Sequence, residues 1–142
     1  MILDKTLTLA ENQAITATAI SENVINWPDV DVVPLETGAI HRNLGAGEEV
    51  PVLMQVTEDF AGLTSLTIEL VTAQNAALTT GDVVLYTTPA IAVADLVAGY
   101  RTSMRWLPDT RMLRYFGARF TVGGANATAG RVTVAIATEV NT

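Results

Sequence analysis

Hydrophobic and polar residues alternate along much of this chain with a period of two, the period of a β-strand that buries one face. Residues 65–71 carry leucine or isoleucine at every second position, and residues 130–139 repeat the pattern with valine and isoleucine. We therefore predict half-buried antiparallel strands at both places. Further strands are predicted at Gln13–Ile20, Val50–Val56, Asp82–Thr87, Arg101–Leu107 and Met112–Val122.

Residues with turn chemistry separate the predicted strands, at 80–82, 108–110 and 123–126. Seven or eight strands at this spacing indicate a sandwich or a jelly roll. Only Ile91–Ala98, between a proline and a glycine, has the pattern of a short helix. Because no repeated amphipathic helix is available to cover a parallel sheet, we predict an all-β fold. The whole chain, residues 1–142, is then one antiparallel β-sandwich domain of jelly-roll type.

Two segments stand apart from this pattern. Residues 1–10 alternate leucine with polar residues and reach about 33 Å when extended, so this N-terminal arm either completes its own sheet or lies across a neighbouring subunit. Residues 27–49 carry two prolines, three glycines and five carboxylates with little periodicity. We predict that they form a long acidic loop or an insertion at one end of the sandwich, where partners are commonly contacted.

The inventory of reactive side chains is small. The chain has one histidine (His41), no cysteine and three serines, beside twenty threonines, which favour strands. His41 and Arg42 could form a base with an electrostatic helper, but a lone histidine in a polar loop is more often solvated. The acidic pairs, such as Glu58–Asp59, lack the pattern of a calcium loop. We therefore expect no enzyme activity, no cofactor and no metal site.

Charge is distributed unevenly along the chain. Residues 1–100 hold Lys5 and Arg42 against thirteen carboxylates, a charge of −11, whereas residues 101–142 hold six arginines against two carboxylates, +4, which together give the net −7. Such an acidic chain is a poor general binder of nucleic acid. The arginines either pair within the fold, lie on a solvated face or meet an acidic partner surface.

Charges within the first six residues leave no room for a secretory signal, and no apolar stretch approaches 18 residues. We therefore expect a soluble protein that does not enter a membrane. Residues 114–122 mix arginines and aromatic residues rather like the RNA-binding strand of an RRM domain, but Tyr115 stands where that signature has glycine. We interpret the segment as a core strand with flanking arginines.

Short motifs follow one another along nearly the whole chain. They are Met1–Leu7, Gln13–Ala19, Ser21–Ile25, Asn43–Glu48, Pro51–Val56, Leu96–Tyr100, Leu107–Pro108, Arg114–Tyr115 and Thr128–Gly130. In type and order these motifs resemble those of the Bbp16-type capsid cement proteins of tailed phages. The main departure is Asn26–Thr37, which is longer and more acidic than the family's usual short link.

The resemblance implies a jelly-roll sandwich, made in the host cytoplasm, that decorates the outer surface of an HK97-like phage head. It would bridge neighbouring capsomers, bind the major capsid protein and form a small homo-oligomer, with a dimer favoured. It implies no direct contact with nucleic acid or membrane. The candidate capsid or self interface comprises Ile2, Leu3, Lys5, Leu7, Trp27, His41, Arg42, Arg101, Arg105, Arg111, Arg114 and Arg119. The alternative is a carbohydrate- or receptor-binding sandwich of a phage appendage, which would need an exposed aromatic platform.

Overall fold

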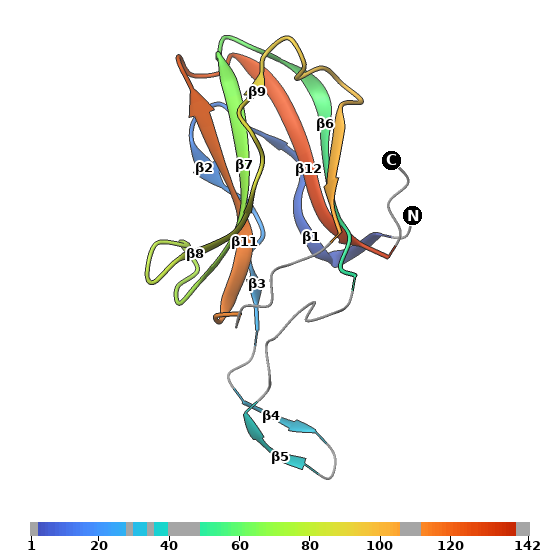
Figure 1. Cartoon of the computed structure of the whole chain (residues 1–142), viewed down its shortest axis with the longest axis vertical. Helices are drawn as coiled ribbons and strands as arrows, with labels where there is room; N and C mark the ends of the chain where they lie inside the picture. Colours follow the sequence, from blue (N-terminus) through green and yellow to red (C-terminus); the bar gives the residue numbers. More distant parts are fainter. Residues whose placement is uncertain (1–2, 28–29, 34–35, 40–48, 106–111, 139–142) are drawn as a thin grey trace.

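The computed structural model describes residues 3–27, 30–33, 36–39, 49–105 and 112–138, and in this part the chain is all β with no helix. Two antiparallel sheets lie face to face (Figure 1), which confirms the predicted β-sandwich. The strands are β1 (Leu3–Ala14), β2 (Ala19–Ile20), β3 (Ile25–Asn26), β4 (Val30–Val33), β5 (Glu36–Ala39), β6 (Val52–Ala61), β7 (Ser65–Ala73), β8 (Val83–Thr87), β9 (Ile91–Ala92), β10 (Arg101–Met104), β11 (Tyr115–Gly123) and β12 (Ala129–Ala137).

The strand order within the two sheets is nested. The four-stranded sheet has the order β1-β12-β6-β10. The six-stranded sheet has the order β2-β11-β7-β8, with β3 also pairing with β11 and β9 with β7. Thus β1 pairs with β12, β2 and β3 with β11, β6 with β10, and β7 with β8 and β9. This pairing of first with last, second with second-last and so inward is the strand order of a jelly roll.

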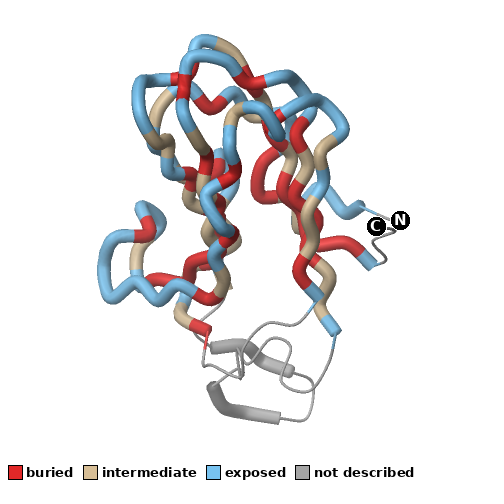
Figure 2. Tube along the Cα trace, turned by 45° about the horizontal axis from the view of Figure 1, so that its top comes forward, coloured by how far each residue is buried: buried red, intermediate tan, exposed pale blue. Residues whose placement is uncertain are grey.

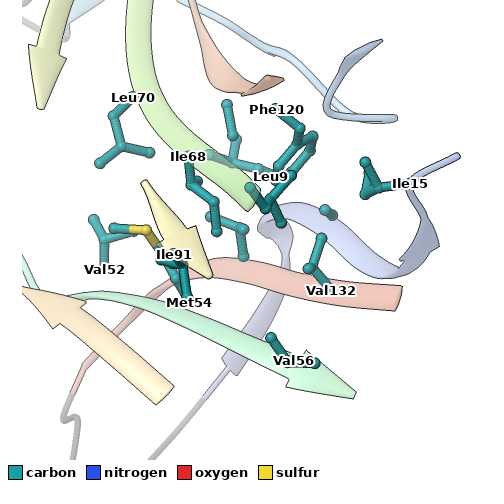
Figure 3. Close-up of a cluster of buried hydrophobic side chains, with 14 of the residues drawn as sticks. Leu9, Ile15, Val52, Met54, Val56, Ile68, Leu70, Ile91, Phe120 and Val132 are labelled. Atoms are coloured by element: carbon teal, nitrogen blue, oxygen red, sulfur yellow. The ribbon is translucent and has the colours of Figure 1, made fainter. Parts of the chain in front are cut away.

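The main core lies between the sheets and follows the alternation seen in the sequence. On β7, Leu66, Ile68 and Leu70 are buried, and on β11 Phe116 and Phe120 are fully buried. Figure 3 shows Ile68, Leu70 and Phe120 close to side chains from the facing sheet. Each such side chain contributes about 1.5–3 kcal/mol by leaving water. The RRM-like segment is therefore a core strand, as predicted.

A second, smaller cluster lies on the outer face of the six-stranded sheet. Val71 and Ala73 face away from the main core and are covered by Leu78, which belongs to the loop 74–82 between β7 and β8. The loop protrudes beside the sandwich in Figure 1. Gly117 permits this packing, because a Cβ there would lie 3.0 Å from Leu78 Cδ1. We call Val71, Ala73 and Leu78 the outer cluster.

The predicted turns at 80–82 and 123–126 are confirmed, because the chain reverses there between β7 and β8 and between β11 and β12. In Figure 2, buried positions recur along the strands, whereas the connections at the top of the view are mostly exposed. The predicted helix at Ile91–Ala98 is wrong. Ile91 and Ala92 form β9 against β7, and the chain then continues in tight turns, such as Leu96 N–H to Val93 O at 3.1 Å. Pairing with the sheet takes the first residues, so too few remain for a stable helix.

The single strand predicted at Gln13–Ile20 is also wrong. The chain leaves the four-stranded sheet after Ala14 and joins the six-stranded sheet at Ala19. Ile15 is fully buried at this corner, where its N–H donates to Gly130 O at 3.2 Å. The apolar alternation continues through the corner, so the sequence pattern does not reveal the break.

The structure assigns strands to both segments that departed from the sequence pattern. Residues 3–10 are the first part of β1 and pair with β12 of the same chain, so the arm completes its own sheet. Residues 27–49 contain the hairpin β4–β5, in which Val30 pairs with Ala39 and Val33 with Glu36, so the described part agrees with the predicted insertion and not with one continuous loop. The short alternation of valine and aspartate at 30–33 carried a strand signal that the surrounding prolines and acidic residues obscured.

Candidate interaction surfaces

The structure distributes the predicted interface residues over several separate places. Ile2, His41, Arg42 and Arg111 lie outside the described residues. The remaining eight fall on β1 (Leu3, Lys5, Leu7), directly after β3 (Trp27), on and directly after β10 (Arg101, Arg105), and at and within β11 (Arg114, Arg119).

The N-terminal half of β1 presents two of its predicted residues to solvent. Leu3 is 45% exposed and Lys5 is exposed, whereas Leu7 packs against the main core. Asp4 fixes the local shape, because one carboxylate oxygen accepts hydrogen bonds from Thr6 N–H at 2.8 Å and from Thr6 Oγ1 at 2.6 Å. These hydrogen bonds to Thr6 lower the pKa of Asp4. The segment is thus a structured part of the sheet with an outward-facing Leu3 and Lys5.

The next part of β1 has its outer edge closed by the link between β2 and β3. Glu11 N–H donates to Glu22 Oε1 at 2.8 Å, Asn23 N–H donates to Leu9 O at 3.0 Å, and Asn23 Nδ2 donates to Thr8 O at 2.8 Å. Side chains and backbone of two residues therefore satisfy the hydrogen-bonding groups that an edge strand would otherwise offer to another chain.

Trp27 and Arg114 lie together where β3 ends and β11 begins. Trp27 N–H donates to Arg114 O at 2.7 Å, and Arg114 Nε donates to Asn26 Oδ1 at 3.1 Å. The guanidinium of Arg114 also lies 5.7 Å from the centre of the Tyr115 ring, within the range of a cation–π contact. Trp27 is half-buried against the main core, so its ring helps to hold β3 in place.

Arg119 belongs to an ion-pair network on the outer face of the six-stranded sheet. Its Nε lies 2.7 Å from Glu69 Oε2, directly across from it on β7, and its Nη1 lies 3.0 Å from Asp82 Oδ2 at the start of β8. The hydrogen bond to Glu69 is the main reason that the pKa of Arg119 is raised. The network links β11, β7 and the N-terminal end of β8.

The arginines of β10 have fewer partners. Arg105 forms an exposed ion pair with Glu49 at 3.2 Å, whereas Arg101 lies opposite Gln55 and forms no ion pair with any residue that the structure describes. Arg101 lies on β10 of the four-stranded sheet and Arg105 directly follows it, whereas Arg119 lies on β11 of the six-stranded sheet and Arg114 directly precedes that strand. The four described arginines of the predicted interface therefore do not form one patch, and three of them make contacts within the fold.

The sequence interpretation missed the outer edge of β8. Val83 and Val84 are each 41% exposed, whereas Leu85 is buried. A register shift explains this, because β8 pairs Val84 with Val71 and Tyr86 with Leu70, which leaves Leu85 as an extra residue between the two pairs. The signal was present in the sequence: three consecutive apolar residues in a half-buried strand must place at least one of them outward.

Other candidate chemistry is used inside the fold. Glu58 pairs with Arg131 at 3.3 Å, and Asp59 accepts a hydrogen bond from Ala98 N–H at 2.7 Å. Among the described residues no three acidic or histidine side chains gather to hold a metal ion, and no helix there is long and apolar enough to cross a membrane. Every aromatic side chain that the structure describes is buried or half-buried, so this part of the chain offers no exposed aromatic platform.

The comparison with protein families matches residues 9–136 to the Bbp16 family model. The match begins in the middle of β1 and ends at Ile136, the second-last residue of β12, so it includes both sheets of the sandwich. No curated protein matches the chain.

Proposed function

Because the chain belongs to the Bbp16 family, which consists of phage structural proteins and indicates a location in the virion, we propose that it is a capsid cement protein. In this role it binds the major capsid protein on the outer surface of an HK97-like head and bridges neighbouring capsomers. The observation that carries the proposal is the family match over 128 of 142 residues, from 9 to 136.

The physical character of the sandwich supports a structural role. A shell offers many equivalent binding sites, so modest contacts that are repeated around it together give strong stabilisation. Such a protein needs a rigid fold and exposed contact residues, and it needs neither an active site nor a cofactor. The jelly-roll core supplies the rigidity, and the two edge strands of the four-stranded sheet supply exposed residues.

We assign the capsid contacts to those two edges. Leu3 and Lys5 lie at one edge, on β1, and Arg101 and Arg105 lie at or next to β10 on the other. Lys5 and Arg101 have no ion-pair partner in the part of the chain that is described, so both charges are available to acidic groups on a capsomer. The role involves no direct contact with nucleic acid or membrane.

The decisive experiment adds the purified chain to phage heads assembled without it. We expect saturable binding in co-sedimentation and a higher temperature of head disruption. Variants Lys5→Ser and Arg101→Ser should bind more weakly. The matched control is Arg131→Ser, because Arg131 lies on the central strand β12 and is already paired with Glu58. This control variant should bind like the natural chain. A folded chain that leaves intact heads undecorated, or that binds glycans instead, would overturn the proposal.

Salt provides a second test of the charged contacts. Between about 0.05 and 0.5 M salt the Debye length falls to a few ångströms, so exposed ion pairs between the chain and the head should weaken. Head binding that is unchanged over this range would count against an electrostatic role for Lys5 and Arg101.

A further inference from the structure

We propose that the outer edge of β8, residues Val83–Thr87, pairs antiparallel with β8 of a second copy of this chain across a two-fold axis. The six-stranded sheets of two copies would then form one continuous sheet. This interaction needs no capsid, so its test does not depend on the proposed cement role.

The edges of the two main sheets differ in how well they are protected against pairing. β1 has three register shifts against β12, carries Asp4, Lys5 and Glu11, and is capped by Glu22 and Asn23. Bulges, charges and covered hydrogen-bonding groups are the means by which proteins prevent edge-to-edge association. The β1 edge is therefore a poor site for self-pairing.

The β10 and β2–β3 edges are also unsuitable. Antiparallel pairing of two β10 strands would bring Arg101 of one copy towards Arg105 of the other, and like charges directly opposite each other are destabilising. β2 and β3 have only two residues each, which is too short for a stable strand pair.

The β8 edge lacks these protections apart from its one register shift. Its inner side pairs with β7, and no strand among the described residues pairs with its outer side. Val83 and Val84 are exposed, and Asp82, the charged residue that directly precedes the strand, is ion-paired with Arg119 at 3.0 Å. The free backbone groups of an edge are satisfied by another strand, and the two valines would leave water when it binds.

The β8 edge is also held in place before it binds. Leu78 in the outer cluster is fully buried, and Asn75 Oδ1 accepts hydrogen bonds from the N–H groups of Thr79 at 2.9 Å and Thr80 at 3.0 Å. These contacts and the Arg119–Asp82 ion pair fix the loop that leads into β8. A preorganised edge loses less conformational freedom on association, which increases affinity.

A two-fold pairing of β8 is chemically self-consistent. In a register centred on Val84, the Val84 side chains of the two copies lie opposite each other on the outer face of the joined sheet, because Val84 pairs with Val71 of the outer cluster. The two Asp82 residues then lie at opposite ends of the strand pair, about 13 Å apart at roughly 3.3 Å per residue. This separation exceeds the Debye length of about 8 Å at physiological salt, so they do not oppose the pairing.

The experiment measures the mass of the purified chain by sedimentation over a range of concentrations. We expect a dimer for the natural chain and at least a tenfold weaker dimer for Val84→Lys, because a lysine on the edge must be desolvated on pairing. Val97→Lys is the matched control, since Val97 is 48% exposed but lies between β9 and β10. A monomer at every concentration, or equal dimerisation of the two lysine variants, would overturn the proposal.

Hydrogen exchange and salt identify the surface independently of the lysine variants. Backbone amides of β8 should exchange more slowly as the chain concentration rises, whereas those of β10 should not change. Each copy carries a net charge of −7, so the two copies repel each other. Added salt screens this repulsion, and the dimer should therefore be equally strong or stronger at higher salt. Concentration-dependent protection of β10 in place of β8 would assign self-association to the other sheet and refute the proposal.

Discussion

Two edge strands of this sandwich, β1 and β8, differ in almost every property that governs association. β1 is twelve residues long, carries charges and register shifts, and has its central part capped by Glu22 and Asn23. β8 is five residues long, exposes two valines and leads from a loop that is fixed over the outer face of its sheet. The longer edge is the more dangerous one for non-specific pairing, and it is the one that is covered. Length alone therefore does not identify an association edge, whereas uncovered backbone beside exposed apolar side chains does.

Among the substitutions that test the difference between the β1 and β8 edges, truncation of Leu78, which holds the loop before β8, should have the largest effect. We expect Leu78→Ala to lower the free energy of unfolding by about 2–5 kcal/mol, because it leaves a cavity in the outer cluster. Leu53→Ala is the matched control, since Leu53 lies in a small buried cluster with Ala137 on the other sheet. Urea unfolding measures both. Only Leu78→Ala should also weaken dimerisation, and equal weakening by Leu53→Ala would show that general stability governs association.

Opening the β1 edge should make it resemble β8. Glu22→Ala removes the acceptor of Glu11 N–H, and we expect a loss of about 1–2 kcal/mol together with faster hydrogen exchange of the Glu11 amide. Light scattering should also detect new association beyond the dimer. Glu22→Gln keeps an oxygen acceptor at the same place and should behave like the natural chain. If Glu22→Ala gains neither faster exchange nor new association, the cap does not protect this edge.

Removing the ion-pair partner of Asp82 tests how much the charge next to β8 affects dimerisation. Arg119→Gln should cost only about 1 kcal/mol or less in stability, since the ion pairs are partly solvated. It should nevertheless weaken the dimer, because the carboxylate of Asp82, once it has lost its ion pair with Arg119, must give up water beside the paired edge. The double variant Arg119→Gln/Asp82→Asn should recover dimerisation in sedimentation experiments. No recovery would mean that Arg119 acts through Glu69 and β7 instead.

The strands with regular alternation were the predictable part of this molecule. β7 and β12 follow the period-two pattern because each has one face on the main core, and the core strand β11 was recognised for the same reason. The corner at Ile15 and the short strand β9 were not predictable, since they depend on pairing with residues distant in sequence.

The candidate site was less predictable than the fold. Arg119 was proposed as a partner contact, yet its two acidic partners are 50 and 37 residues away, a separation at which sequence patterns carry no information about ion pairs. The exposure of Val83 and Val84 depends on the register shift at Leu85, which is a property of how β7 and β8 pair. Edges become visible only when the order of strands in each sheet is known.

The smallest effect concerns the start of β1, where Asp4 maintains the local structure beside Leu3. The pKa of Asp4 is lowered by its hydrogen bonds with Thr6, so its contribution to stability is present above the ordinary aspartate pKa of about 3.9 and is lost as the pH falls through the lower folded value. In an NMR titration the Thr6 amide should shift at a pH below that of the same titration in the urea-unfolded chain, and Asp4→Asn should abolish the shift. Amide signals of β8 should not respond, because no part of the Asp4 turn contacts that sheet edge. A coincident titration in folded and unfolded chains would mean that the start of β1 is held by its pairing with β12 alone, and the contrast with β8 would then rest on the cap at Glu22 and Asn23.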